Sequence, residues 1–311
     1  MRRSFFFFFH RASPSTSDLR PLLQLTFLSP QTPTHTQSTN QLPSWGYTRY
    51  ANHLASWGYA AVQYDPEPYW LTIMPRGVET ELFVNPVIEW ALGPGAAAAN
   101  TQLDARRMGV TGHSLGGKVS VLALGYSKTG SKHAGPTNIS AAFLLDAVDI
   151  RIVTHEAPYF YSNMGETFAN ITVPIGAMGM PIRDKCTIAG HSWDIVYPSA
   201  RKGSWMFLVY KSSHVVWMAA AEEAKDKIVF DYATFMCGGV GPNSKEATIK
   251  YTLAAMTAWF DGGNVGDPGK AAGGVGDANT PALQQQFLSW AQSPVQEKWV
   301  WFGIKNSSRF D

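Results

Sequence analysis

The strongest constraint on the fold comes from the segment 110–118, which reads VTGHSLGGK. In this segment Ser114 stands between Gly112 and Gly116, at the spacing Gly-x-Ser-x-Gly. A serine at a sharp turn from strand to helix crowds the residues two places away on either side, so only residues with little or no side chain fit there. The spacing therefore predicts a strand, a tight turn at Ser114 and a helix.

The flanking residues decide whether such a short motif has formed by chance. Residues 107–110 are suited to a short strand, and residues 118–124 continue as a helix of small and apolar side chains. The turn places the backbone N–H of Leu115 at a helix N-terminus, where it can face a developing negative charge. Ser114 is thus predicted to be a catalytic nucleophile, and the N–H of Leu115 one donor of an oxyanion hole.

Composition narrows the class of protein. The chain has 311 residues, of which 45% are hydrophobic and 15% charged, with a formal net charge of +2. This length suits one large α/β domain with a sizeable core, and so small a net charge gives no field that favours nucleic acid. Only two cysteines occur, Cys186 and Cys237, and their pairing is left open. No apolar run approaches the length that spans a membrane.

The first 44 residues differ from the rest of the chain. They begin with two arginines and a run of phenylalanines (residues 5–9), and continue as a Ser/Thr/Pro/Gln-rich tract whose only acidic residue is Asp18. An Arg- and Ser-rich, acid-poor N-terminus is typical of an organelle transit peptide. The alternative is non-coding sequence translated in place of the true start. Both interpretations place residues 1–44 outside the fold.

Residues 45–311 alternate between helical and strand patterns. The expected helices cover residues 47–57, 79–92, 118–124, 245–260 and 282–291, and the expected strands cover residues 59–64, 107–110, 139–145, 172–178 and 205–209. Gly93-Pro94-Gly95 is expected to end the second helix, and the Gly-rich residues 261–279 to form a mobile surface loop. The alternation predicts an α/β domain with a mostly parallel, doubly wound sheet and helices on both faces.

A serine nucleophile needs a base and a carboxylate that orients the base. In doubly wound sheets the reactive groups gather at the carboxyl ends of the strands. Asp146 directly follows the strand 139–145, and His214 follows the strand 205–209. With Ser114 they stand in the chain order Ser, Asp, His that is typical of α/β-hydrolases, which predicts that fold and a Ser114–His214–Asp146 triad.

Three other residues near these motifs have alternative or neighbouring positions. Asp149, three residues after Asp146, is the alternative acid. His191 is the alternative base, but it stands in a polar stretch that no strand delivers. His113 precedes the nucleophile, and its side chain is expected to point away from the site.

Several motifs in order resemble those of plant and algal chlorophyllases. The elbow segment 112–118 is similar to the family's Gly-His-Ser-Arg-Gly-Gly-Lys, and the resemblance covers about residues 45–260. Further matching segments are residues 47–59 (the helix and strand ahead of the elbow), 145–149 (the triad acid), 173–179 (Val-Pro-x-x-x-x-Gly), 186–194 and 213–218 (the histidine segment).

The resemblance implies a serine esterase that hydrolyses the phytyl ester of chlorophyll, giving chlorophyllide and phytol, in a chloroplast. It assigns Ser114 as the acylated nucleophile, His214 as general base and then acid, and Asp146 as its orienting partner. It implies a small hydrophobic ester as substrate and no metal or cofactor, and a substrate of this kind is compatible with contact to a membrane surface. The elbow and triad alone also fit a broader esterase or lipase, or a degenerate hydrolase without activity.

The sequence departs from the family pattern at three points. Leu115 replaces an arginine, and Ala147 replaces the proline that follows the triad acid. The family also places a His-Gly oxyanion loop, on its own strand, shortly before the position of Tyr47, where residues 37–41 here read QSTNQ. The N-terminal strands of the sheet, and the second oxyanion donor, are therefore expected to be missing or replaced.

Overall fold

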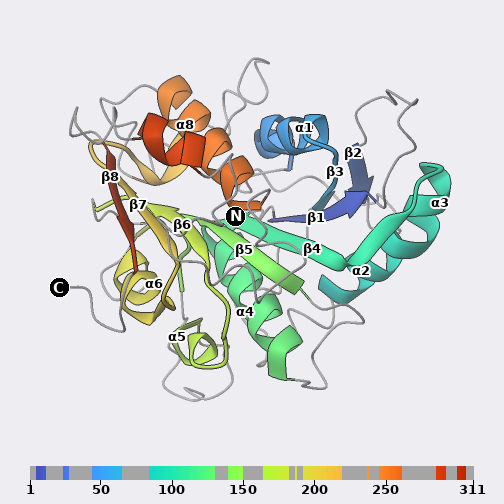
Figure 1. Ribbon diagram of the computed structural model, residues 1–311, viewed down its shortest axis with the longest axis horizontal. Coiled ribbons are helices and arrows are strands. Elements are labelled where there is room, and N and C mark those ends of the chain that lie inside the picture. Colours follow the sequence, from blue (N-terminus) through green and yellow to red (C-terminus); the bar gives the residue numbers. More distant parts are fainter. Residues whose placement is uncertain are drawn as a thin grey trace.

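The computed structural model describes residues 5–11, 24–27, 44–64, 84–129, 139–149, 164–181, 186–187, 192–218, 237, 245–260, 285–291 and 300–305. These residues form a mixed, mostly parallel sheet with helices on both faces (Figure 1). The sheet has eight strands in the order β2-β3-β1-β4-β5-β6-β7-β8.

The parallel part of the sheet contains the strands that lead into the predicted site. β4 (Leu103–His113), β5 (Ile139–Leu145), β6 (Gly176–Gly179) and β7 (Trp205–Val209) are successive parallel neighbours. β8 (Val300–Ile304) adds an antiparallel edge, and β2 (Gln24–Phe27) forms the other edge in parallel with β3 (Tyr59–Tyr64). The predicted strands 59–64, 139–145 and 205–209 are confirmed as β3, β5 and β7.

The phenylalanine run forms β1 (Phe5–Arg11), which lies between β3 and β4 and is antiparallel to both. The expectation that residues 1–44 lie outside the fold is therefore wrong for β1 and β2. Both β3 and β4 have a backbone edge whose N–H and C=O groups need partners inside the protein. β1 pairs with β3 on one side and with β4 on the other, so its backbone satisfies both edges.

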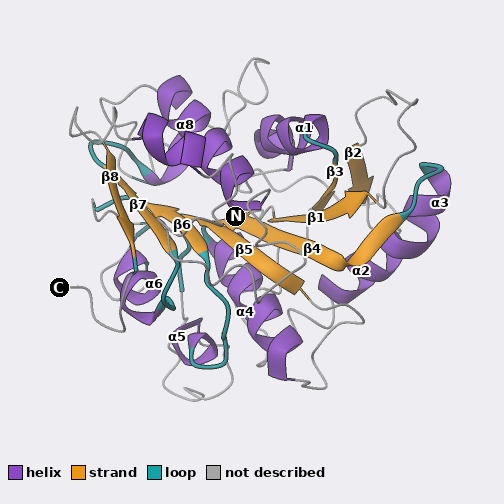
Figure 2. Cartoon of the chain, viewed as in Figure 1, coloured by secondary structure: helices purple, strands orange, loops and turns teal. Residues whose placement is uncertain are grey.

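The helices form two layers, one on each face of the sheet (Figure 2). One face is covered by α1 (Thr48–Ser56) and α8 (Lys245–Trp259), and the other by α2 (Asn85–Trp90), α4 (Leu115–Thr129), α5 (Met164–Phe168) and α6 (Trp193–Ser199). The buried strand β5 contributes to both cores: Phe143 faces α1 and α8, whereas Leu144 faces the opposite layer. This alternation is the period-two geometry of a strand.

The second predicted helix continues past its expected end. Residues 84–98 are helical, with a π turn over Ala91–Gly95 joining α2 to α3 (Ala96–Ala98). Pro94 has no N–H to donate, and the wider turn accommodates it without breaking the helix. The helix expected over residues 282–291 is described from residue 285, and the Gly-rich residues 261–279 lie outside the described ranges.

Candidate active site

Ser114 forms the turn between β4 and α4 by itself, because β4 ends at His113 and α4 begins at Leu115. Its φ of 59° lies in the left-handed region that residues other than glycine rarely adopt. A Cβ atom on Gly112 would lie 2.3 Å from the carbonyl carbon and oxygen of Gly116, so a side chain there is sterically excluded. The predicted strand, tight turn and helix are thus confirmed, with Ser114 at the turn and 8% exposed.

Backbone hydrogen bonds fix this turn against the neighbouring strand ends. The N–H of Ser114 donates to the carbonyl of Leu145 at 3.0 Å, and the carbonyl of Ser114 accepts the N–H of Val148 at 3.0 Å. The N–H of Asp146 in turn donates to the carbonyl of Met178 at 2.6 Å. The turn and the segment after β5 therefore hold one another at the carboxyl edge of the sheet.

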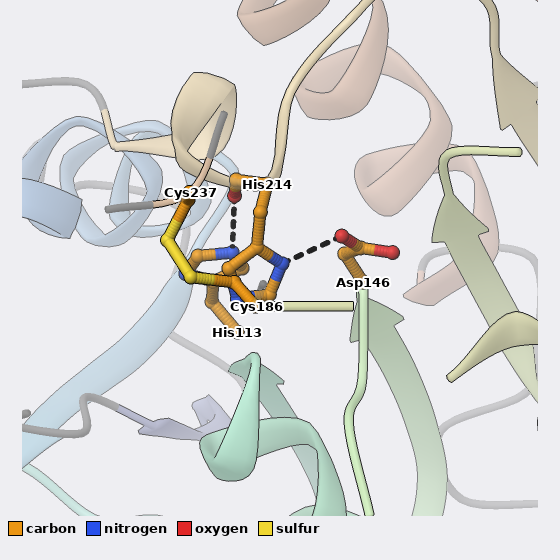
Figure 3. Close-up of a disulfide and its surroundings, with 5 residues drawn as sticks. All are labelled: His113, Asp146, Cys186, His214 and Cys237. Carbon is orange, nitrogen blue, oxygen red and sulfur yellow. Dashed lines mark hydrogen bonds and ion pairs between the residues drawn. A yellow bond between two sulfur atoms is a disulfide. The ribbon is translucent and has the colours of Figure 1, made fainter. Parts of the chain in front are cut away.

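The structure brings Asp146 and His214 together at this edge. Oδ2 of Asp146 lies 2.6 Å from Nδ1 of His214, and both side chains are buried (Figure 3). The other carboxylate oxygen accepts the N–H of Met180 at 3.3 Å. Because an ionised carboxylate only accepts hydrogen bonds, Nδ1 of His214 carries the hydrogen, and in the neutral ring Nε2 is then the basic nitrogen.

The alternative acid makes different contacts. Asp149 is fully buried, with Oδ1 3.0 Å from Nζ of Lys118 and Oδ2 accepting the N–H of Met164 at 3.2 Å. Lys118 lies in the first turn of α4, so this ion pair joins the elbow helix to the segment that follows Asp146. The alternative base, His191, lies outside the described residues.

His113 does not point away from the site as expected. Its ring lies over that of His214, with ring centroids 4.5 Å apart, and its Nε2 is 2.7 Å from the carbonyl oxygen of His214 (Figure 3). Tyr47 reaches the other ring nitrogen of His113, Oη to Nδ1, at 2.5 Å. Sequence reasoning missed both contacts because no local pattern indicates which segments pack over the last residue of β4.

The pKa of His113 is lowered to about 3, first by burial and then by the neighbouring His214, although Asp146 and the hydrogen bond to the His214 carbonyl act to raise it. His113 is therefore neutral at any pH at which the triad could work.

The two cysteines, whose pairing the sequence left open, form a disulfide between Cys186 and Cys237. Cys186 follows β6 and Cys237 follows the 3-10 helix η4 (His214–Trp217), and both are buried. Figure 3 shows the disulfide beside the ring of His214. The bond thus joins the segments that follow two strands of the site.

The backbone N–H that was expected to be an oxyanion donor, that of Leu115, lies at the start of the elbow helix. Leu115 is the first residue of α4, and the first N–H groups of a helix have no acceptor within it. The strand next to the elbow is β1, and Phe5 at its beginning pairs with Gly112. β1 therefore begins beside the elbow, with its carboxyl end at the opposite edge of the sheet. The resemblance implies a strand whose carboxyl end leads into an oxyanion loop at the elbow, and β1 does not have this direction.

Two cavities lined by described residues differ in size. The one lined by Asp146 has about 10 Å³, which is room for a single water. The other has about 460 Å³ and is lined by α1, α8 and residues 285–291, with Trp57 and Trp290 at its rim. Trp57 precedes the amino end of β3, which runs parallel to β4, so the larger cavity lies toward the sheet edge opposite the elbow.

Within the described ranges, no three His, Cys, Asp or Glu side chains gather in a way that could hold a metal ion. In the same part of the chain no helix combines the length and the apolar character needed to cross a bilayer. No protein-family model and no curated protein matches the sequence. The case for a function therefore depends on the geometry of Ser114, Asp146 and His214.

Proposed function

We propose that this protein is a serine carboxylesterase of the α/β-hydrolase fold. The observation that carries the proposal is the 2.6 Å contact between Asp146 and His214 at the sheet edge where Ser114 occupies a strained turn. The three residues follow β4, β5 and β7 in the chain order Ser, Asp, His, which is the order of that fold.

In the proposed mechanism the hydroxyl of Ser114 attacks the ester carbonyl while Nε2 of His214 removes its proton. The protonated imidazole then gives this proton to the departing alcohol, which leaves an acyl-enzyme on Ser114. A water molecule, deprotonated by the same nitrogen, hydrolyses the acyl-enzyme and restores the serine. Asp146 keeps His214 in the reactive tautomer, and the N–H of Leu115 faces the negative oxygen that forms in each step.

The proposed substrate is the phytyl ester of chlorophyll, with chlorophyllide and phytol as products, in a chloroplast. The resemblance of the elbow, acid and histidine segments to chlorophyllases supports this substrate and location. The reaction requires no cofactor, since the magnesium of chlorophyll belongs to the substrate. There are two competing proposals. One is a broader esterase or lipase, and the other is a hydrolase that is inactive because it lacks the second oxyanion donor. Loss of one such donor lowers the rate by about a hundred- to a thousandfold.

Labelling with a fluorophosphonate probe separates an active from an inactive hydrolase. We expect the protein to be labelled and the Ser114→Ala variant not to be; labelling that survives this substitution would rule out Ser114 as the nucleophile. Incubation with chlorophyll in mild detergent then identifies the substrate by a pigment product that has lost phytol. Turnover of short nitrophenyl esters without loss of phytol would favour the broader esterase.

A membrane surface is the proposed partner, and two exposed tryptophans support it. Trp57 and Trp290 are 46% and 48% exposed and line the same apolar cavity. Tryptophans at such positions are suited to the headgroup region, where one side of the ring is apolar and the other wet. We expect flotation with lipid vesicles to fall in the Trp57→Ser/Trp290→Ser variant; unchanged flotation would exclude this surface as the contact.

A further inference from the structure

His113 connects three elements that meet behind the proposed nucleophile. It is the last residue of β4, it contacts Tyr47 at the end of η1 (Ser44–Tyr47), and it contacts His214 at the start of η4. All three residues are almost completely buried. The ring of His113 lies over that of His214 at an interplanar angle of 36°, while its two nitrogens bond in opposite directions.

The donor and acceptor groups around His113 determine which of its ring nitrogens carries the hydrogen. The backbone carbonyl of His214 can only accept, so Nε2 of His113 carries a hydrogen and donates it across 2.7 Å. In a neutral imidazole the other nitrogen, Nδ1, is then an acceptor, so the hydroxyl of Tyr47 donates to it across 2.5 Å. The resulting order is Tyr47 hydroxyl to His113, and His113 to the carbonyl of His214.

His214 is therefore held at two points. Asp146 holds the side chain through Nδ1, and His113 holds the backbone carbonyl and one face of the ring. His113 immediately precedes Ser114, so the same residue fixes the base relative to the nucleophile. A neutral ring over His214 also interacts favourably with the imidazolium that forms during acyl transfer, as aromatic faces do with cations.

We propose that His113 and Tyr47 are positioning residues of the triad, with Tyr47 orienting His113 and His113 fixing His214 against Ser114. The inference rests on the proposed function, since it concerns the same nucleophile. Misplacing a reacting group by about 1 Å costs on the order of a hundredfold in rate. Loss of the hydrogen bonds that link Tyr47, His113 and His214 should thus slow the reaction of Ser114 without removing any group that touches the substrate.

The test measures the rate constant for phosphonylation of Ser114 by a fluorophosphonate probe. We expect Tyr47→Phe to lower it about tenfold and His113→Phe about a hundredfold, within the range for a misplaced group. His113→Gln keeps an N–H donor near the position of Nε2 and should recover part of the loss. The matched control is Tyr251→Phe, which removes a buried hydroxyl from the same core where its ring contacts Phe207 and Phe287 instead of His113.

Two controls separate positioning from general damage to the fold. With a nitrophenyl ester, the loss should fall on kcat with KM little changed, and His113→Gln and His113→Phe should differ in rate at similar melting temperatures. Proton NMR provides a readout that needs no activity, since the low-field resonance of the His214 Nδ1–H should shift or broaden in Tyr47→Phe and not in Tyr251→Phe.

The outcomes distinguish this inference from the proposed function. If the wild-type protein is labelled and the Tyr47→Phe and His113→Phe variants are labelled as fast as the wild type, the positioning role is wrong while the esterase proposal stands. If the unchanged protein is not labelled at all, the esterase proposal fails and the positioning role fails with it. An unaltered His214 resonance in Tyr47→Phe would also contradict the inference.

Discussion

Lys118 and Asp149 form an ion pair inside the protein, with Nζ and Oδ1 3.0 Å apart and the side chains 7% and 0% exposed. The pair joins the first turn of α4 to the segment after β5. That segment carries Asp146, and the turn before α4 carries Ser114. This ion pair thus reinforces the backbone hydrogen bond from Val148 to Ser114 in holding the segments of Asp146 and Ser114 together.

Removing one member of this pair should destabilise the protein strongly. Lys118→Met leaves the carboxylate of Asp149 buried without its cation, which costs about 3–5 kcal/mol in comparable cases. The double variant Lys118→Met/Asp149→Leu removes both charges and should recover most of the loss. Urea unfolding of the three proteins measures the free energies. A cost below about 1 kcal/mol for the single variant would place the pair in the class of solvent-screened ion pairs.

Asp146→Asn should reduce kcat by about four orders of magnitude, because the amide favours the wrong tautomer of the base. Asp149→Asn is the comparison, since it changes the other carboxylate of the same segment. We expect this second variant to lower stability but to keep most of its activity per folded molecule. Steady-state rates on a nitrophenyl ester, corrected for the folded fraction, check both. The reverse pattern would make Asp149 the orienting acid.

Gly112→Ala should disrupt the elbow. The added Cβ would meet the backbone of Gly116 at 2.3 Å, and backbone atoms cannot move aside as a flexible side chain can. We expect loss of both fluorophosphonate labelling and thermal stability. Gly93→Ala is the control, because a Cβ there meets no atom within 4 Å. Normal labelling of Gly112→Ala would show that the turn is less closely packed than the structure indicates.

His113 should make stability depend on pH. Its pKa is about 3 in the folded protein against an ordinary value of 6.5, so the folded state binds fewer protons than the unfolded state between these values. The stabilisation is complete above pH 6.5 and is lost at up to about 1.4 kcal/mol per pH unit as the pH falls toward 3. Titratable groups facing the ring are His214 from η4, Asp146 after β5 and Tyr47 from η1.

Unfolding free energies at pH 7, 6, 5 and 4 measure this dependence, with His113→Gln as the comparison. The variant has no group that titrates at this position, so its stability should fall less steeply over the same interval. Identical slopes for the two proteins would show that His113 is protonated as readily when folded as when unfolded.

Phe7→Pro should destabilise the sheet, whereas Phe7→Val should be tolerated. Phe7 pairs with Val62 of β3 and Val110 of β4, so proline at this position removes a donor from the middle of the sheet. Valine keeps the backbone donor and favours a strand. Melting temperatures of the two variants provide the comparison. Equal melting temperatures would support the expectation from sequence that residues 1–44 lie outside the fold.

The elbow and the ends of β5 and β7 could be predicted because they depend on local patterns. The two glycines around Ser114, with a strand pattern before them and a helix pattern after them, indicate a tight turn from residues close together in sequence. Asp146 and His214 each follow a short apolar run, and parallel strands bring such positions to one edge of a sheet. The place of β1 could not be predicted, since composition suggested a targeting segment. It enters the sheet because the facing backbone edges of β3 and β4 need hydrogen-bond partners, which β1 provides.

The sequence by itself determined the turn at Ser114 and the order of the three strand ends, because spacing and periodicity act within a few residues. Only the tertiary structure decided that Asp146 rather than Asp149 contacts His214, that His113 lies over its ring, and that Cys186 pairs with Cys237. These outcomes depend on how distant segments pack together: 51 residues separate Cys186 from Cys237, 68 separate Asp146 from His214, and 101 separate His113 from His214. Local patterns therefore predicted the three candidate residues, and long-range packing brought Asp146 and His214 into contact.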